Sequence, residues 1–145
     1  MTSTKRRPAA TLLVAAIAVM ALFAGCTSPQ TQEATGRLNA DRGAYGLAPL
    51  VSSDMLNAKA QMWAQVLAGQ DTLFHSNLTD GIGGCWRSLG ENVGYGGSIA
   101  TVESSYMNSP PHRANILSSS YRYVGTGVAW NGNMVFTVQE FMQPC

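Results

Sequence analysis

The chain has 145 residues, a formal net charge of +1 at pH 7 and 12% charged residues. Three of its nine basic residues lie within the first seven positions, so the rest of the chain carries six basic side chains against eight acidic ones. This balance leaves no basic patch to neutralise phosphates and argues against nucleic acid as a partner, and the length suits a single domain.

The first 25 residues have the pattern of a secretory signal. Lys5, Arg6 and Arg7 precede an uncharged apolar run from Ala9 through Phe23, which is the order of charged and apolar regions in the leader of an exported chain. The run of about 15 to 17 residues is short for a helix that crosses a bilayer. We therefore expect residues 1–25 to be removed and the mature protein to lie outside the cytoplasm.

The leader ends at a cysteine. The segment LFAGC, residues 22–26, resembles the lipobox of bacterial lipoproteins, whose cysteine is acylated and becomes the new N-terminus, although Phe23 stands where leucine is commoner. Two or more acyl chains hold a protein firmly at a membrane. We predict that Cys26 is lipidated and anchors the protein, and the alternative is an ordinary cleaved leader. Residues 26–33 are then a polar tether, and 34–145 form the domain.

Two further cysteines, Cys85 and Cys145, remain in the mature chain. Thiols of exported proteins tend to oxidise, so we expect these two residues to form a disulfide. The alternative is two free thiols.

Apolar residues at helical spacing predict three helices. The first covers residues 34–45, the second begins after the serines at 52–53, and the third begins near Ser98. Pro110 and Pro111 end the third helix, because proline lacks the backbone N–H that a helix interior needs.

A glycine-rich segment between Gly69 and Gly97 predicts a loop with one short strand near residues 91–95. The clearest strand signal is at the C-terminus, where YRYVGTGVAW and MVFTVQEFM are joined by NGN, which suits a hairpin with a type I′ turn. Helices first and paired strands last indicate an α+β fold with helices packed on an antiparallel sheet.

Five segments resemble, in order, those of the CAP superfamily (cysteine-rich secretory proteins, antigen 5, pathogenesis-related 1) in its short bacterial form. They are LNADRGAYGLAPL at 38–50, His75, GENVGYG at 90–96, YMNSPPHRANIL at 106–117, and YVGTGVAW with VQEF in the hairpin. The resemblance covers nearly all of the chain after the leader. It implies an α-β-α sandwich, in agreement with the helices and hairpin read from the residues.

The resemblance also implies a cleft in which His75, Glu91 and His112 face one another. Animal and plant members carry a second glutamate before the second histidine, and the corresponding position here is Ser109. Glu103 lies a turn or more away along the chain and is no substitute. The four-residue His-Glu-Glu-His cavity of the family is therefore incomplete in this sequence.

Two imidazoles and a carboxylate suit a divalent metal such as zinc. The resemblance implies His75 and His112 as the metal ligands and Glu91 as the group that orients a metal-bound water. The alternative is a polar network without metal, in which Glu91 and His112 satisfy buried backbone groups.

Four neighbouring residues are expected to support the cleft: Asn92, Ser109, Arg113 and Asn115. Asn115 can hydrogen-bond to loop backbone, and Arg113 can reach a carboxylate. Both residues lie in a short helical turn after His112, which the two prolines deliver to a fixed place.

Three functions are compatible with these residues. The sequence has no His-Glu-x-x-His, Gly-x-Ser-x-Gly or Walker A motif, so we expect a lipid-anchored binding module rather than an enzyme, with a weakly held divalent metal and an envelope, lipid or host ligand. The alternative is a metal-assisted hydrolase in which His75 and His112 hold zinc and Glu91 is the general base. The third is a purely structural interaction platform.

Overall fold

The structure is a computed structural model that describes residues 28–145. The expected signal and Cys26 lie outside the described residues. The elements are, in chain order, α1 Pro29–Ala44, β1 Val51–Ser52, α2 Asp54–Gln70, β2 Trp86–Gly96, α3 Ile99–Asn108, α4 Pro110–Ile116, β3 Tyr123–Asn131 and β4 Met134–Pro144. Within residues 28–145, the helices are all too short or too polar to cross a bilayer.

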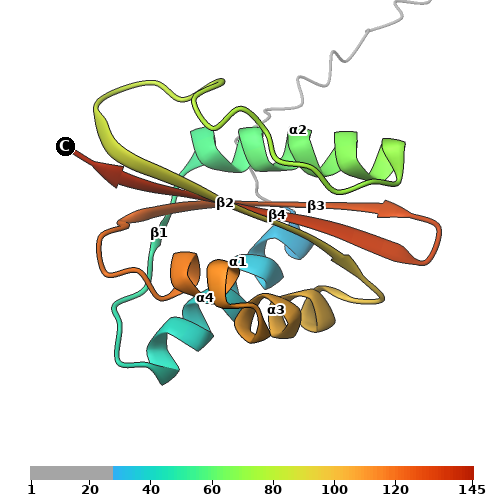
Figure 1. Cartoon of the computed structure of the whole chain (residues 1–145), viewed down its shortest axis with the longest axis horizontal. Coiled ribbons are helices and arrows are strands. Elements are labelled where there is room, and N and C mark those ends of the chain that lie inside the picture. Colours follow the sequence, from blue (N-terminus) through green and yellow to red (C-terminus); the bar gives the residue numbers. More distant parts are fainter. Residues whose placement is uncertain (1–27) are drawn as a thin grey trace, which may run out of the picture.

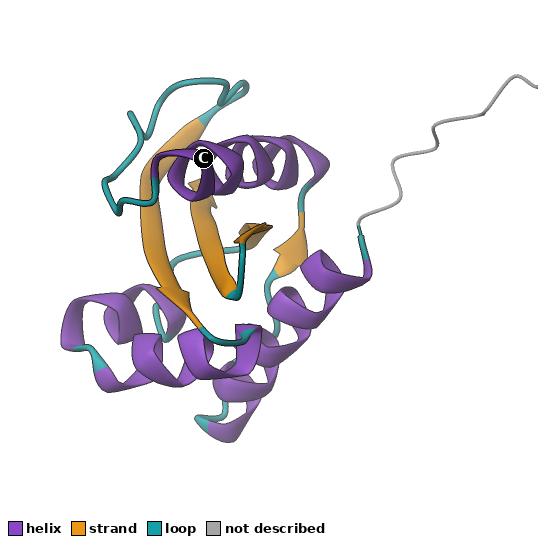
Figure 2. Cartoon of the chain, turned by 90° about the vertical axis from the view of Figure 1, so that its right-hand side faces the viewer, coloured by secondary structure: helices purple, strands orange, loops and turns teal. Residues whose placement is uncertain are grey.

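The elements form three layers. The sheet has the order β1-β3-β4-β2, with α2 on one face and α1, α3 and α4 on the other (Figures 1 and 2). This arrangement confirms the predicted α-β-α sandwich and the C-terminal hairpin of β3 and β4. The sheet is not wholly antiparallel, because the two-residue strand β1 pairs with β3 in parallel.

Each face of the sheet buries its own apolar cluster. Ala60, Ala64 and Leu67 of α2 pack with Phe136 and Val138 of β4 on one face. The other cluster includes Leu38, Val102, Tyr106, Ile116 and Phe141. The three helices below the sheet therefore hold together through one core and fix the position of α4.

The backbone of α2 lies directly on β3. A Cβ added to Gly125 would overlap the backbone of Leu56 and Asn57, and one added to Gly127 would overlap Ala60. The segment YVGTGVAW therefore needs its two glycines for the close approach of a helix to a strand.

Three local features differ from the sequence-based expectations. Helix α1 begins at Pro29, inside the segment expected to be a tether, because the Ser28 side chain accepts a hydrogen bond from the Thr31 N–H at 3.1 Å and Pro29 suits the first helical turn. Strand β2 is longer than the expected 91–95. In the hairpin turn only the first central residue, Gly132, has a positive φ (56°), which is the requirement of a type II′ turn and not of type I′.

Cys85 and Cys145 form the expected disulfide, with their Cα atoms 5.5 Å apart. The bond joins the residue before β2 to the residue after β4, and these two strands pair along their whole length. It therefore ties the start of β2 to the end of β4, at the point where the loop before β2 joins the sheet.

Candidate functional site

His75 lies in the loop between α2 and β2 and faces Glu91 of β2. Its Nδ1 is 2.6 Å from Glu91 Oε1, and the backbone N–H of Ser76 donates to the same oxygen at 3.0 Å. The His75 side chain is 61% exposed, whereas the Glu91 side chain is 1% exposed. A carboxylate only accepts, so Nδ1 carries a proton, and in the neutral imidazole Nε2 keeps a free lone pair.

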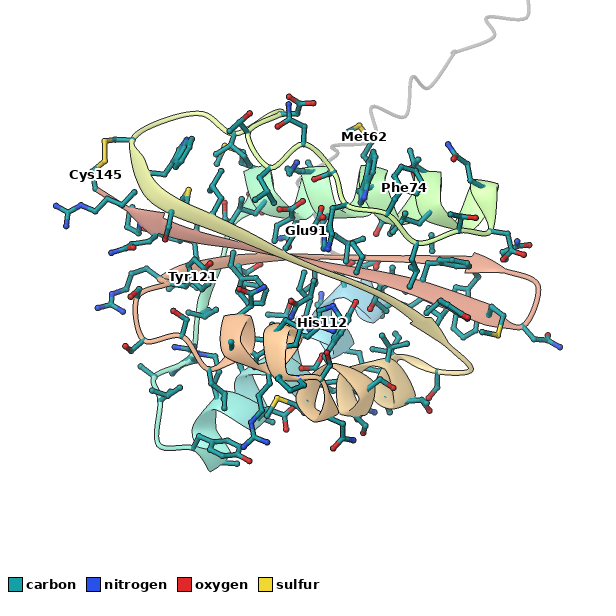
Figure 3. The ribbon with its side chains drawn as sticks, viewed as in Figure 1. Met62, Phe74, Glu91, His112, Tyr121 and Cys145 are labelled. Atoms are coloured by element: carbon teal, nitrogen blue, oxygen red, sulfur yellow. A yellow bond between two sulfur atoms is a disulfide. The ribbon has the colours of Figure 1, made fainter. Side chains whose placement is uncertain are left out.

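Contacts to α2 hold this loop in place. The Trp63 indole N–H donates to the Phe74 carbonyl at 3.0 Å, and the two rings pack edge to face. Lys59 Nζ donates to Ser76 Oγ at 2.9 Å and to the Asn77 carbonyl at 2.8 Å. These bonds flank His75 on both sides, so helix α2 fixes the position of the imidazole. Figure 3 labels Phe74 beside α2, Glu91 at the sheet and His112 on the side of α4.

A second carboxyl group lies behind Glu91. Glu140 pairs with Glu91 across β4 and β2, and its Oε1 is 3.5 Å from Lys59 Nζ. Burial, and then the neighbouring Glu91, raise the pKa of Glu140 to about 8, although Lys59 acts in the opposite direction. Glu140 is therefore protonated at neutral pH and contacts Glu91 as a neutral acid.

His112 approaches the same place from α4. It packs edge to face on the buried Tyr106 ring, with the ring centroids 5.1 Å apart. Burial, and then the nearby His75, lower the pKa of His112. Its imidazole is therefore neutral at pH 7, and the two histidines are near enough for their charges to interact. We call His75, Glu91 and His112 the histidine cluster.

Two asparagines tie α4 to β2. Asn92 is fully buried and donates from Nδ2 to the His112 carbonyl at 3.1 Å and to Gln139 Oε1 at 2.9 Å. Asn115 Nδ2 donates to Asn92 Oδ1 at 2.9 Å and to the Glu91 carbonyl at 3.3 Å. These bonds set the backbones of His112 and Glu91 relative to each other.

Ser109 and Arg113 lie outside the histidine cluster. Ser109 links α3 to α4 and makes no side-chain capping bond, while its backbone carbonyl accepts from the Arg113 N–H at 2.9 Å. The Arg113 guanidinium donates to the Tyr45 hydroxyl at 2.7 Å and lies over that ring. Arg113 therefore holds α4 to the end of α1, and its partner is a phenol and not the expected carboxylate.

Three buried polar residues near the cluster were not predicted from the sequence: Lys59, Gln139 and Glu140. The signal in the sequence is a consecutive polar pair, Gln139 and Glu140, flanked on both sides by apolar residues of the C-terminal strand. Both residues are almost fully buried. Glu140 contacts Glu91 of the histidine cluster, whereas the Gln139 amide accepts from Asn92 and donates to Glu103. A consecutive polar pair in a buried strand indicates that both faces of the strand meet polar partners.

The residues of the cluster fit a weakly held metal. Nε2 of His75 and the neutral imidazole of His112 are suitable nitrogen donors for zinc, and the Glu91 carboxylate fixes the tautomer of His75 as metal-bound histidines require. Within residues 28–145, no three His, Cys, Asp or Glu side chains are grouped as a metal-ligand set. Water would have to complete the coordination, so the affinity is expected to be low.

Comparison with known proteins identifies similar sequences and folds. Residues 35–141 match the family model described as the Cysteine-rich secretory protein family, CAP. An uncharacterized protein of Bacillus subtilis (strain 168), YkwD, is 29% identical over 105 residues, which is 66% of this chain and 41% of that protein. The chain thus spans about two fifths of the length of that relative.

Two solved structures share the fold. An outer surface protein from Borrelia burgdorferi superposes with a TM-score of 0.71 at 18% identity, covering 83% of this chain and 96% of that chain. NaASP2, solved with Zn²⁺, superposes with a TM-score of 0.60 at 12% identity, covering 82% of each chain. Similarity at this level of identity shows a common architecture.

Proposed function

The chain belongs to the cysteine-rich secretory protein (CAP) family, and from this premise we propose that it is an extracytoplasmic binding module whose histidine cluster holds a divalent metal. The contact between His75 Nδ1 and Glu91 Oε1 carries the proposal, because it leaves Nε2 as a metal donor on an exposed side chain. The Zn²⁺ in NaASP2 shows that a protein of this fold takes up that ion.

The geometry favours binding over hydrolysis. A general base must reach the proton of a metal-bound water, but Glu91 is buried and its Oε1 already accepts from His75 and Ser76. Its Oε2 is also buried, and the neighbouring Glu140 is a neutral acid that can donate to the Glu91 carboxylate. We therefore propose Glu91 as a positioning residue for His75. A metal bound here supplies an attachment point for an envelope, lipid or host ligand.

Removal of both histidines tests the metal proposal. Because the chain has only two histidines, the His75→Ala/His112→Ala variant should show no zinc binding in a calorimetric titration at pH 7.5. Glu91→Gln should bind zinc about tenfold more weakly, because the oriented tautomer is lost.

Gln65→Ala, at an exposed position of α2, is the matched control and should bind zinc like the unmodified chain. Equal zinc binding by the double-histidine variant would show that the metal binds elsewhere. If the unmodified chain bound no zinc, the metal proposal would fail, and the histidine cluster would act as a polar network without metal.

We further propose that Cys26 carries the lipid anchor. The proposal rests on the sequence LFAGC and on the position of Ser28, two residues later, as the N-cap of helix α1, which would hold the domain close to the membrane surface. In a bacterium that processes lipoproteins, the unmodified chain should sediment with the membranes, and Cys26→Ser should not. Thr27→Ala is the control. Equal membrane association of Cys26→Ser would contradict the anchor.

A further inference from the structure

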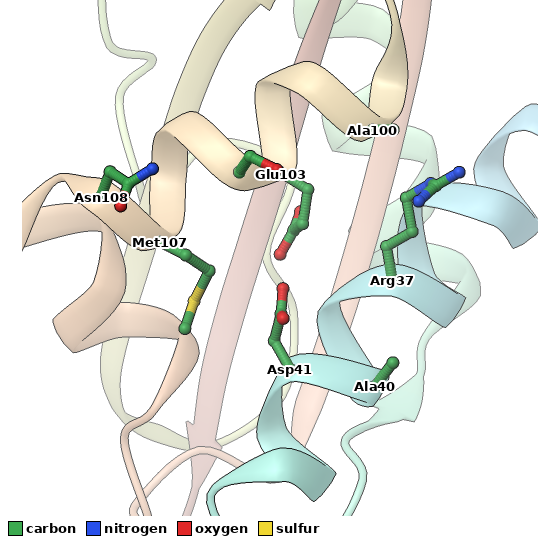
Figure 4. A pocket seen from close by; sticks show the side chains of 8 residues that line it. Arg37, Ala40, Asp41, Ala100, Glu103, Met107 and Asn108 are labelled. Carbon is green, nitrogen blue, oxygen red and sulfur yellow. The ribbon is translucent and has the colours of Figure 1, made fainter.

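A second polar site lies between α1 and α3, outside the histidine cluster. It is a pocket of about 310 Å³, and the side chains that line it include Asp41 of α1 and Glu103, Ser104 and Asn108 of α3. In Figure 4 the carboxyl groups of Asp41 and Glu103 point toward each other across the pocket. Two like-charged groups are thus placed face to face on neighbouring helices.

Glu103 is buried with one oxygen unused. The residue is 6% exposed, and one carboxyl oxygen, Oε2, accepts from Gln139 Nε2 at 2.6 Å. The other oxygen, Oε1, is buried without a hydrogen-bond donor. A buried carboxyl oxygen without a donor is unfavourable. Its hydrogen-bonding neighbour on this side of the pocket is the Asp41 carboxyl, which can donate only when the pair holds a proton.

Apart from Asp41, the side chains around the pocket supply neither a strong positive charge nor a donor for this oxygen. Arg37 lines the pocket, but its Nε donates to Glu33 at 2.9 Å, and it has only a small effect on Glu103. The Tyr106 hydroxyl bonds to Thr137 instead. Either a shared proton or a bound cation must therefore separate the two carboxyl groups.

We propose that this pocket binds a hydrated divalent cation of the Mg²⁺ or Ca²⁺ class, with the Asp41 and Glu103 carboxylates as its charged ligands. Carboxylate, amide and water oxygens are the ligands these ions prefer, and Ser104 and Asn108 add neutral oxygens at the edge of the pocket. A site with two carboxylates and several waters binds weakly, and Ca²⁺ sites of extracellular modules have dissociation constants of about 10⁻⁴ to 10⁻³ M.

Protons compete with the cation at this site. Burial, and then Asp41, raise the pKa of Glu103 to about 8, while the Gln139 hydrogen bond and Arg37 lower it. Tyr106 is the other titratable group near Glu103, and it stays neutral because burial raises its pKa. The apparent affinity for the cation should therefore fall about tenfold for each pH unit below 8.

Thermal unfolding of the full chain in detergent tests the site. At pH 8.5, 10 mM CaCl₂ should raise the midpoint by about 4 °C over NaCl of equal ionic strength, if the dissociation constant is about 1 mM. The shift should disappear at pH 6. MgCl₂ in a parallel titration shows which of the two ions the pocket prefers.

Variants of both carboxylates locate the effect. Asp41→Asn and Glu103→Gln should each lose the calcium shift, while Asp54→Asn, which removes an exposed charge at the start of α2, should keep it. The His75→Ala/His112→Ala variant should also keep the calcium shift. The calcium proposal can then fail or succeed independently of the zinc proposal at the histidine cluster. Equilibrium dialysis of the unmodified chain should give one calcium site.

Three results would overturn the proposal. If CaCl₂ at pH 8.5 raised the unfolding midpoint no more than NaCl does, a shared proton would be the partner of the Asp41 and Glu103 carboxyl groups. A shift that survives in both carboxylate variants would place the ion elsewhere. A dialysis experiment that finds no calcium bound to the unmodified chain would also overturn the proposal, whether or not either variant folds.

Discussion

Replacement of both Cys85 and Cys145 by serine is expected to lower the free energy of unfolding by about 4 kcal/mol. The bridge spans 60 residues of sequence, so its loss returns a large loop entropy to the unfolded chain. A cost of this size is a large share of the 5–15 kcal/mol that typical domains have. Urea unfolding of the double-serine variant and of the unmodified chain measures it.

Loss of the disulfide should increase local opening of the backbone most strongly at the start of β2. There the Cys145 N–H donates to the Cys85 carbonyl at 3.3 Å, and Trp86 pairs with Pro144. Amide exchange should therefore accelerate in this end of β2 and in the preceding loop, while the centre of β4 stays protected. Ser88→Ala, which removes one hydrogen bond to Gln143 from the same region, is the control. Equal unfolding free energies with and without the disulfide would contradict the expectation.

Local signals explain why much of the fold was predictable. Ser53 and Ser98 accept hydrogen bonds from the N–H groups of Leu56 and Thr101, so they cap the second and third helices as expected. The two β-rich runs and the NGN turn between them predicted the C-terminal hairpin. These features depend on residues close together in sequence, and such patterns are what periodicity detects.

The buried polar groups were not predictable in the same way. Glu103 appears in the sequence as one polar residue on a helix, and its packing against Asp41 depends on how α1 and α3 meet. Glu140 acquires its role only when α2 and β2 bring Lys59 and Glu91 beside it. Contacts between three distant segments have no period along the chain, so only the tertiary structure reveals them.

The residues of the histidine cluster were named from a family resemblance and not from spacing. The structure brings His75 against Glu91 and sets His112 nearby through Asn92. It separates Arg113 from them, because the guanidinium packs on Tyr45. A motif read along the chain therefore identified the cluster but could not distinguish a side chain that faces it from one that faces α1.

Conformational stability should fall as the pH rises from 5 to 8, and Glu140 should cause a large part of the fall. The folded chain keeps a proton on Glu140 up to about pH 8, whereas the unfolded chain releases it near pH 4.3. The unfolded state therefore binds fewer protons in this range, and stability decreases with pH. Glu140 alone should contribute about 3 kcal/mol between pH 5 and 8.

Glu140→Gln separates this contribution from those of other groups. Between pH 7 and 8 His112 is mostly neutral in both states, because its pKa is about 6.5 in the unfolded chain and lower in the folded chain, so Glu103 and Glu140 dominate. With a chelator present, the unmodified chain should lose about 2 kcal/mol over this unit of pH, and Glu140→Gln about 1 kcal/mol. Urea unfolding at several pH values measures the slopes.

The pH dependence of the free energy of unfolding also tests the role of Glu140, the second carboxyl group beside Glu91. A neutral Glu140 leaves a single negative charge on the pair, which Glu91 can direct to His75, while an ionised Glu140 would repel it. Glutamine mimics the neutral acid and can still accept from Lys59, so Glu140→Gln should keep zinc affinity and gain stability above pH 8. Glu33→Gln, at an exposed position, should leave the slope unchanged. An unchanged slope in Glu140→Gln would mean that Glu140 is ionised beside Glu91, with Lys59 neutralising it.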